Sequence, residues 1–497
     1  YRPGPLESIP RYIERKHNPK LIHYLDPRMK EYLDFSYGIL VYQDDVLLTA
    51  IKLGGYSWLE ADALRKAMGK KIPKVMQAEK EKLTKGFMEY GKLSKQLSEK
   101  LWELIEPFAA YGFNKCLSSS TRIFDANTGT PTSIETLLKR NSGINVHALD
   151  TNLKFARAKG SRPFANGTRL LFKLKTRSGR EIRATGNHPF RTFDGWTSLE
   201  DLVRGTRIAT PRFIPAPANI KPFAFHEAAT LGYLLSEGNL CHPYGIYFYS
   251  TQEDELQDFI DTAILFSNAK VTIDRSKAAA SVYVGQRTRG KGSGLNAWIT
   301  ALGLKGKKAV EKFVPSCVFS ADNESLAVFL GKLWQGDGSI SVKNLQAFYA
   351  TSSRTLADDV QHLLLRFGIT STIHTKSFHY RNGTKVGWTV VVTARENIAQ
   401  FSKTIGAHLI GKKSAELHSL VSATAQRTNN LGRGTPDTVP TKILELIRSE
   451  MKRKKIGTAE LAMLANVSER LLGADVRKRG ITRKSLYKLA HALRSKP

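Results

Sequence analysis

The spacing of apolar positions divides the chain into four segments. Residues 1–115 place apolar residues at helical spacing within Lys- and Glu-rich stretches, which predicts amphipathic helices. Residues 116–212 consist of short alternating runs punctuated by Gly, Asn and Asp, which predicts a compact all-β domain. Residues 213–420 return to mixed α/β patterning. A linker over 421–440 and a small all-α module over 441–497 complete the multidomain organisation that we expect.

The mixed segment contains an internal repeat with a constant offset of 100 residues, the distance from Glu237 to Asp337. Each copy begins with an apolar helical stretch, TLGYLLSEG or LGKLWQGDG, that ends in an acid followed by glycine. Glycine there is typical of a helix C-terminus, where the helix dipole disfavours a carboxylate. Small residues would let the two helices pack closely about a pseudo-twofold axis: Gly232, Ser236, Gly331 and Gly336.

Such packing would bring Glu237 and Asp337 together as a divalent-cation site. Mg²⁺ takes one or two carboxylates together with phosphate oxygens. It can activate water and stabilise both oxygens of a phosphodiester displacement. We therefore predict that these two acids are catalytic metal ligands of a Mg²⁺-dependent nuclease. The alternative is that each is an exposed residue at a helix end without a role, and the repeat and the basic surroundings argue against it.

The two motifs resemble the LAGLIDADG helices of homing endonucleases over roughly 225–400, with Glu237 in place of the usual Asp. The resemblance implies two pseudo-symmetric repeats that cleave double-stranded DNA. It also implies that Lys312, in GLKGKKAVEKFVP, assists phosphate chemistry; the alternative is a solvated lysine. Lys376 or Lys385 is the expected lysine of the second half. The strands would form a basic DNA-binding saddle whose expected contacts are Arg287, Arg289, Lys376 and Arg381.

The net charge of +32 favours a polyanionic partner, and nucleic acid is the first expectation. A basic membrane-surface protein is the rival class. The sequence has no long apolar run and no N-terminal apolar region of the secretory kind, which argues against it. The three cysteines are far apart, so we expect neither a zinc site nor a disulfide framework. We expect a cytoplasmic, reducing location. Cys241 and Cys317 are expected to be buried thiols.

Cys116 lies where the sequence pattern changes from one that predicts helices to one that predicts β-strands. A thiol at such a boundary can attack the preceding carbonyl and convert the Lys115–Cys116 peptide bond to a thioester. The step needs a general acid for the departing nitrogen and donors for the developing oxyanion. The stretch REIRATGNHPF supplies Thr185 and His188, three residues apart and able to converge from one tight loop. The alternative for His188 is an ordinary turn residue.

The stretches CLSSSTRIF, TGNHPF and WTSLEDLVRG resemble the N-terminal splicing blocks of inteins, which have the Hint fold. The resemblance implies that Cys116 is the nucleophile, that Thr185 and His188 are its partners, and that splicing needs no cofactor. Inteins end in a His-Asn pair before a downstream nucleophile, and no such pair follows Cys116 as far as Pro497. We therefore expect splicing to require a missing C-terminal segment, either contiguous or supplied in trans.

Residues 1–115 resemble the fingers region of the bacterial DNA polymerase III alpha subunit in RPGPLESIPRYIERKH, YGILVYQDDVLLTA, GYSWLEADALRKAMGKK and FAAYGFNK. The resemblance implies a host protein with other replicative polymerase subunits as partners. The palm carboxylates of such polymerases are not in this sequence, so the fragment is not expected to polymerise DNA.

Residues 441–497 resemble the helix-turn-helix of the lambda-repressor type in TAELAMLANVSERLL and SLYKLAHAL. The resemblance implies a recognition helix beginning near Ser468, with Ser468 and Arg470 facing the major groove. A plain basic helical bundle is the alternative.

Together these segments predict a self-processing intein that carries a homing endonuclease, inserted in a polymerase subunit. The second hypothesis is a catalytically decayed insert that only binds DNA. The first is favoured because five residues with catalytic chemistry persist: Cys116, Thr185, His188, Glu237 and Asp337.

Overall fold

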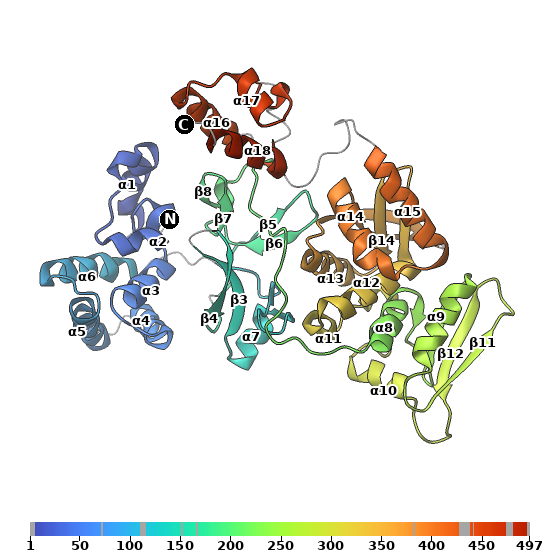
Figure 1. The fold of residues 1–497 in the computed structure, drawn as a ribbon. Helices are drawn as coiled ribbons and strands as arrows, with labels where there is room; N and C mark the ends of the chain where they lie inside the picture. Colours follow the sequence, from blue (N-terminus) through green and yellow to red (C-terminus); the bar gives the residue numbers. More distant parts are fainter. Residues whose placement is uncertain are drawn as a thin grey trace.

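The computed structural model of this 497-residue chain describes residues 5–70, 73–109, 116–150, 153–165, 167–380, 383–426, 438–440, 442–473 and 481–494. Figure 1 shows an N-terminal group of helices, a β-rich segment beside it, a large α/β segment and a small helical group at the C-terminus. Among the described residues, no helix combines the length and apolar character needed to cross a membrane.

The N-terminal segment is helical, as the sequence predicts. Its core is built around the fully buried Leu53, Phe87 and Trp102. The α-helices are α1 (Pro5–His17), α2 (Lys30–Leu33), α3 (Gln43–Lys52), α4 (Trp58–Lys70), α5 (Pro73–Glu89) and α6 (Lys95–Ala109). Three short 3₁₀ turns lie between α1 and α3: η1 (Pro19–Leu21), η2 (Pro27–Met29) and η3 (Asp34–Ser36).

The segment after Cys116 consists mainly of two-stranded antiparallel ribbons. The first pairs β1 (Arg122–Phe124) with β2 (Pro131–Ser133), and the second pairs β3 (Ile144–Leu149) with β4 (Phe155–Gly160). The third pairs β5 (Phe172–Lys175) with β6 (Glu181–Ala184), and the fourth pairs β7 (Pro189–Thr192) with β8 (Gly195–Ser198). A 3₁₀ turn, η4 (Leu199–Asp201), follows.

This segment also contains a helix, α7 (Ile134–Arg140), so the expectation of an all-β domain needs correction. The side chain of Ser133 caps the start of α7 by accepting from the Thr136 N–H at 3.1 Å. The helix ends at Asn141, whose φ of 52° is left-handed, a conformation that Asn tolerates. These start and stop residues are visible in the sequence, but a seven-residue stretch is too short to display helical periodicity.

The α/β segment contains two helix-and-sheet halves. The first has α8 (Phe225–Glu237), β9 (Gly238–Asn239), β10 (Ile246–Ser250), α9 (Glu253–Ala263), β11 (Ala269–Asp274), β12 (Ala280–Gln286) and α10 (Gly294–Ala301). Between the halves lie η5 (Ala309–Glu311) and α11 (Ser316–Ser320). The second has α12 (Asn323–Asp337), β13 (Gly338–Ser341), β14 (Gln346–Thr351), α13 (Arg354–Leu364), η6 (Leu365–Phe367), β15 (Ser371–Tyr380), β16 (Gly383–Val392), α14 (Arg395–Lys403), η7 (Ile405–His408) and α15 (Gly411–Gln426).

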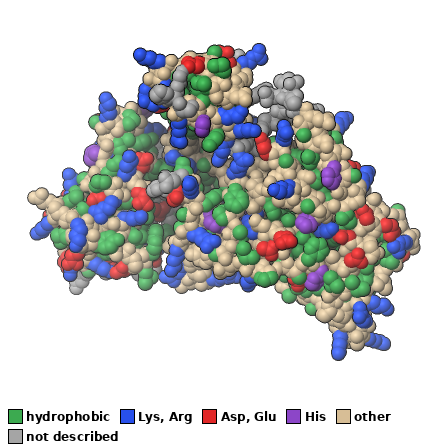
Figure 2. All heavy atoms as spheres, viewed as in Figure 1, with side chains coloured by type: hydrophobic (Ala, Val, Ile, Leu, Met, Phe, Trp, Pro, Cys, Tyr) green, Lys and Arg blue, Asp and Glu red, His purple; other side chains and the backbone are tan. Residues whose placement is uncertain are grey.

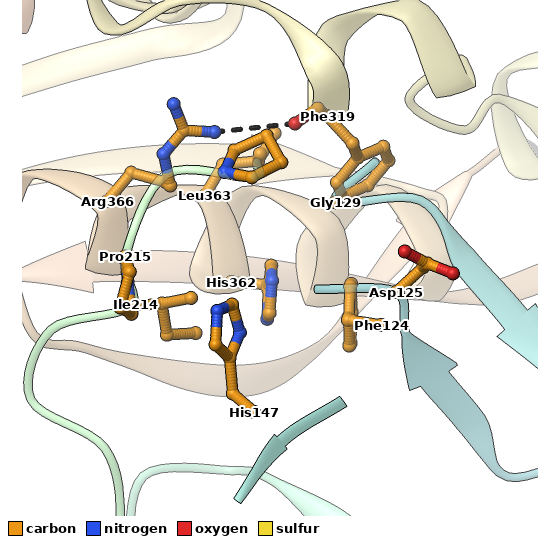
Figure 3. Close-up of a pocket in the computed structure, with 11 residues that line it drawn as sticks. Phe124, Asp125, Gly129, His147, Ile214, Pro215, Phe319, His362, Leu363 and Arg366 are labelled. Carbon is orange, nitrogen blue, oxygen red and sulfur yellow. Dashed lines mark hydrogen bonds between the residues drawn. The ribbon is translucent and has the colours of Figure 1, made fainter. Parts of the chain in front are cut away.

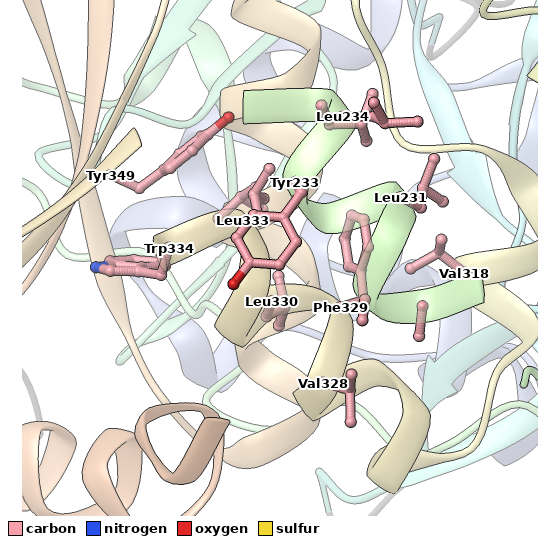
Figure 4. Packing of buried hydrophobic residues seen from close by; sticks show 14 of the residues in the cluster. Leu231, Tyr233, Leu234, Val318, Val328, Phe329, Leu330, Leu333, Trp334 and Tyr349 are labelled. Atoms are coloured by element: carbon pink, nitrogen blue, oxygen red, sulfur yellow. The ribbon is translucent and has the colours of Figure 1, made fainter. Parts of the chain in front are cut away.

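Both halves arrange their strands in the same way. The sheet orders are β9-β10-β12-β11 and β13-β14-β16-β15, and every pair is antiparallel. One continuous hydrophobic core joins the halves across the contact between α8 and α12. Figure 4 shows Tyr233 of α8 meeting Leu330 and Leu333 of α12 there.

The C-terminal module has its own small core, which includes Leu461, Ile481 and Leu489. It contains β17 (Thr438–Val439), α16 (Ile443–Arg453), α17 (Thr458–Leu464), η8 (Glu469–Leu471), β18 (Ile481–Thr482) and α18 (Arg483–Arg494). Helix α15 runs to Gln426 and therefore takes in the first residues of the expected linker.

Candidate functional site

Two glycines allow α8 and α12 to lie in close contact. A methyl group on Gly232 would come within 2.6 Å of the Phe329 carbonyl oxygen, and one on Gly336 within 2.0 Å of Ser236 Oγ. Three of the four small residues that the sequence singled out are therefore at the helix contact. The fourth, Gly331, faces η7 instead, where a methyl group would lie 2.6 Å from His408 Cβ.

Glu237 and Asp337 are the final residues of these two helices, and each is followed directly by a strand. Glu237 is exposed and Asp337 is half-buried. Burial, and after it the charge of Glu237, raises the pKa of Asp337 to about 7. The charged forms of the two acids therefore repel each other at the ends of the paired helices.

Lys312 lies beneath the end of α8 and is 5% exposed. Its Nζ donates to the carbonyl oxygens of Leu234, Leu235 and Ser236 at 2.9–3.1 Å, and to that of Gly238 at 3.0 Å. Burial lowers the pKa of this lysine to about 8. The structure therefore excludes the alternative of a solvated lysine, because the side chain is buried. Its positive charge lies at the negative end of the α8 dipole.

Lys413 occupies the corresponding place under α12. Its Nζ donates to the carbonyl oxygens of Gln335 and, at 2.9 Å, Gly336. Burial lowers the pKa of Lys413, and the charge of Glu255, 4.0 Å from Nζ, opposes that effect. The sequence interpretation missed this residue, although it follows Lys312 by 101 positions, close to the repeat offset.

The two lysines that the sequence offered for the second half lie elsewhere. Lys376 is on β15, where its Nζ is 5.8 Å from the ring centroid of Phe348. Lys385 is an exposed residue of β16, paired across the ribbon with Phe378. The lysine that donates to the carbonyl end of α12 is instead Lys413 of α15. The role expected of Lys376 or Lys385 stays a prediction.

The residues present fit a divalent cation, although the described part of the chain contains no group of three or more His, Cys, Asp or Glu residues that could hold one. Two carboxylates are the number that Mg²⁺ commonly takes from a protein when phosphate oxygens and water complete its coordination. Burial and, after it, the charge of Glu237 raise the Asp337 pKa, and a cation would relieve the repulsion between the two acids.

Cys116 and Thr185 form a second cluster in the β-rich segment. The Cys116 N–H donates to Thr185 Oγ1 at 3.0 Å, and the Thr185 N–H donates to the Cys116 carbonyl oxygen at 3.0 Å. His188 lies in the same turn, where its N–H donates to the Thr185 carbonyl oxygen at 3.0 Å. Lys115, which supplies the carbonyl of the expected thioester, lies outside the described residues.

Comparison with known families matches two parts of the chain. The bacterial DNA polymerase III alpha subunit finger domain matches residues 1–91, and a LAGLIDADG-like domain matches residues 324–406. The chain is similar to a bacterial DNA polymerase III alpha subunit interrupted by an intein with a LAGLIDADG endonuclease. We therefore refer below to the polymerase-like segment (1–115), the intein-like β segment (116–212) and the LAGLIDADG segment (213–426).

Individual relatives likewise match different shares of this chain. The replicative DNA helicase DnaB of Rhodothermus marinus is 32% identical over 390 residues, which are 76% of this chain and 40% of the helicase. The DNA polymerase III subunit alpha of Staphylococcus epidermidis is 42% identical over 113 residues, 23% of this chain and 10% of the polymerase. This chain thus spans less than half the length of either relative. Among solved structures, the Ssp DnaB mini-intein variant M86 has 38% sequence identity to this chain. The match covers 20% of this chain and 65% of that chain, with a TM-score of 0.19.

Expected DNA contacts of the LAGLIDADG segment lie on its surface. Arg287 and Arg289 are exposed in the loop after β12, and Lys376 is exposed on β15. Arg381 lies outside the described residues. Figure 2 shows Lys and Arg side chains spread widely over the visible face of the molecule, including the outer tip of this segment.

In the C-terminal module, Ser468 and Arg470 are exposed. The expected recognition helix is represented by the single turn η8, and residues 474–480 lie outside the described residues. Elsewhere, Cys241 is exposed, which corrects the expectation of a buried thiol. Cys317 is partly buried, and burial raises its pKa to about 11.

Proposed function

We propose that Glu237 and Asp337 hold a divalent cation, Mg²⁺, at which the LAGLIDADG segment cleaves both strands of a DNA target. The observation that carries this proposal is the placement of two mutually repelling carboxylates at the ends of two helices in backbone contact. A bound Mg²⁺ would supply Lewis-acid stabilisation of the phosphate and activation of water.

The chain's own residues prepare this site for a phosphodiester. Lys312 and Lys413 each neutralise the carbonyl end of one helix and keep positive charge beneath the acids. Gly232 and Gly336 fix the separation of the helices and with it the separation of the carboxylates. Gln335 anchors the α12 end, because its Nε2 donates to Glu255 at 2.8 Å and its Oε1 accepts from the Ile410 N–H at 3.0 Å.

The two halves act as pseudo-symmetric repeats, each of which covers half of the DNA target. The shared strand order of the two sheets and the shared lysine cap support this proposal. Basic residues around the sheets would contact phosphates: Arg287, Arg289, Lys376 and Arg381. The C-terminal module would extend the footprint as a helix-turn-helix through Ser468 and Arg470.

Cleavage of a defined duplex tests this function. The uninterrupted polymerase gene across the codons for Phe113, Asn114 and Lys115 is the candidate target. We expect cutting of this duplex in Mg²⁺, no cutting in EDTA, and no cutting of a duplex in which the insert sequence separates the two flanks. Equal cutting of the interrupted and uninterrupted duplexes would contradict a homing function.

We also propose that the intein-like β segment performs an N-to-S acyl shift at Lys115–Cys116. The contact between Cys116 N–H and Thr185 Oγ1 supports it. The Cys116 thiol gives up its proton to solvent and Sγ attacks the Lys115 carbonyl carbon. The C–N bond then breaks, and the departing nitrogen takes a proton to become the free amine of Cys116. His188 is the general acid for that nitrogen, and Thr185 orients the peptide. Complete splicing would also need the C-terminal His-Asn pair that the intein resemblance implies.

Hydroxylamine tests the thioester. It converts the acyl group of Lys115 to a hydroxamate and releases residues 1–115, which mass spectrometry identifies by the mass of the C-terminal hydroxamate. We expect this product from the parent chain and none from Cys116→Ala. The decayed, DNA-binding insert remains the alternative function, and it predicts neither hydroxamate nor DNA cutting. Partners of the host polymerase would be other replisome subunits.

A further inference from the structure

The two stretches of chain that meet at Cys116 and Thr185 run side by side away from that site. Leu117 forms a bridge with Ala184, and the Ser118 N–H donates to the Arg183 carbonyl oxygen at 3.0 Å. One stretch leads on into β1, which begins at Arg122, and the other is β6, which is reached from the turn 176–180. The register of these two stretches therefore sets the geometry at Cys116.

The turn before β6 is fixed to the LAGLIDADG segment by three hydrogen bonds. The Ser178 carbonyl oxygen accepts from the Ile373 N–H and from Gln361 Nε2, both at 2.9 Å. The Gly179 carbonyl oxygen accepts from Arg354 Nη2, also at 2.9 Å. Arg354 is itself oriented by Asp358, whose Oδ2 accepts from Arg354 Nε at 2.9 Å.

Gly179 shows how close this junction is. A methyl group on it would lie 2.5 Å from the Ile373 carbonyl oxygen, and its φ of +84° is left-handed. Gln361, which is 2% exposed, also donates to the Ser371 carbonyl oxygen at 3.1 Å. The turn thus lies directly against the start of β15 and one face of α13.

The start of β1 is anchored to the same helix. Arg122 Nη2 donates to Asp359 Oδ1 at 2.5 Å, and the other Asp359 oxygen accepts from the Val314 N–H at 3.1 Å. The Phe124 and His362 rings stack with centroids 3.5 Å apart. Figure 3 shows Phe124 and His147 of the β segment facing His362 of α13 at this junction.

The β segment has little interior of its own to hold these strands. Among its described residues, the buried hydrophobic side chains are few and two of them are alanines: Ala126, Leu137, Ile144 and Ala184. Phe124 packs instead against the core of the LAGLIDADG segment. Contacts with α13 therefore supply much of what fixes β1 and β6 relative to each other.

We propose that Arg354 and Gln361, two residues of the LAGLIDADG segment, are positioning residues for the acyl shift at Cys116. They hold the turn 176–180, and through β6 they hold Thr185 in register with Cys116. The two residues touch none of the reacting atoms. This proposal rests on the proposed self-processing function, and it extends that function to a helix outside the β segment.

The test is the rate at which a small thiol releases residues 1–115 from the full chain, followed by mass spectrometry. Misplacement of reacting groups by about 1 Å costs about a hundredfold in rate, so we expect Arg354→Ala and Gln361→Glu to slow release roughly ten- to hundredfold. Gln361→Glu keeps the side-chain shape and removes the donor. Arg354→Lys retains a cationic donor and is expected to restore most of the rate. Arg395→Ala, an exposed arginine at the start of α14, is the matched control and should leave the rate unchanged.

Amide exchange and DNA cutting separate positioning from unfolding. In the slow variants the Ser118 and Thr185 amides should exchange faster, while Mg²⁺-dependent DNA cutting stays at the parent level. Absence of release from the parent chain would overturn the self-processing function itself. Release from the parent with equal rates in Arg354→Ala and Gln361→Glu would overturn only the positioning proposal, as would loss of DNA cutting together with release.

Discussion

The main-chain nitrogen of Cys116 lies 3.0 Å from Oγ1 of Thr185, a residue 69 positions further along the chain. This nitrogen is the atom that must leave the Lys115 carbonyl in the proposed acyl shift. Thr185 is 8% exposed, so its hydroxyl meets Cys116 with little competition from water. The return bond from the Thr185 N–H to the Cys116 carbonyl oxygen makes the contact two-sided.

Replacing the Thr185 hydroxyl therefore tests its role in the acyl shift. We expect Thr185→Val to slow thiol-induced release about ten- to hundredfold, because the isosteric methyl cannot accept the Cys116 N–H. Thr185→Ser should keep most of the rate. Thr206→Val removes an exposed hydroxyl in the same segment and serves as the control. Release by Thr185→Val at the parent rate would remove Thr185 from the mechanism.

Asp337→Asn should stabilise the fold without metal, and the effect should depend on pH. The Asp337 pKa is raised from 3.8 to about 7, so the folded state binds more protons than the unfolded state between those values. Stability from this group is therefore full below about pH 4 and falls as pH rises through 7. At pH 8 the asparagine variant should gain roughly 1–4 kcal/mol, and at pH 4 almost nothing.

Thermal unfolding in EDTA, followed by tryptophan fluorescence at both pH values, measures this gain. At pH 8, Mg²⁺ should make the parent chain more stable than the variant, because the cation stabilises the parent chain more. A variant that gains nothing at pH 8 in EDTA would show that neither burial nor the charge of Glu237 raises the Asp337 pKa in the folded chain.

Lys312→Met should destabilise the LAGLIDADG segment by roughly 2–4 kcal/mol. The change leaves carbonyl oxygens at the end of α8 buried without their donor, including those of Leu234 and Leu235. Lys308→Met, the same change at an exposed position nearby, is the control and should cost little. Denaturant unfolding compares the two. Equal small effects would mean that Lys312 does not support the helix end.

Gly336→Ala should push the two helix ends apart. The added methyl group would lie 2.0 Å from Ser236 Oγ and 2.5 Å from Ser236 Cβ, a clash that costs roughly 1–3 kcal/mol. Gly292→Ala, at a glycine with open space around it, should be almost neutral. Urea denaturation of both variants gives the comparison. If Gly336→Ala is as stable as Gly292→Ala, the close helix contact is not a constraint.

Much of the LAGLIDADG segment was predictable because its repeat can be recognised from short stretches of sequence. An apolar helical stretch that ends in an acid and a glycine specifies its own end, so the positions of Glu237 and Asp337 at helix ends followed from sequence alone. Lys413 did not follow, because it reaches α12 from α15, 78 residues after the carbonyl of Gln335 that it contacts. In a basic segment, the sequence does not distinguish one lysine from its neighbours until the carbonyl partners of each are known.

The junction between the β segment and α13 could not be predicted either. Gly179 occupies an ordinary turn sequence, and its close approach to Ile373 depends on a partner almost two hundred residues away. Gly331 shows the converse error, since a small residue at the right helical spacing proved to face η7 rather than α8. Pattern identifies which positions can come close, and tertiary packing decides which partner they meet.

The proposed site at the paired helix ends is tested most directly by cleavage of the uninterrupted target duplex in Mg²⁺ by Glu237→Gln and Asp337→Asn. Both changes keep side-chain size and remove charge, and DNA binding in EDTA, measured on the same duplex, checks that each variant still recognises its target. We expect parent-like binding, with cleavage reduced by at least about a hundredfold in Asp337→Asn and strongly reduced in Glu237→Gln. Parent-level cleavage by Asp337→Asn, with intact binding, would contradict the assignment of the metal site.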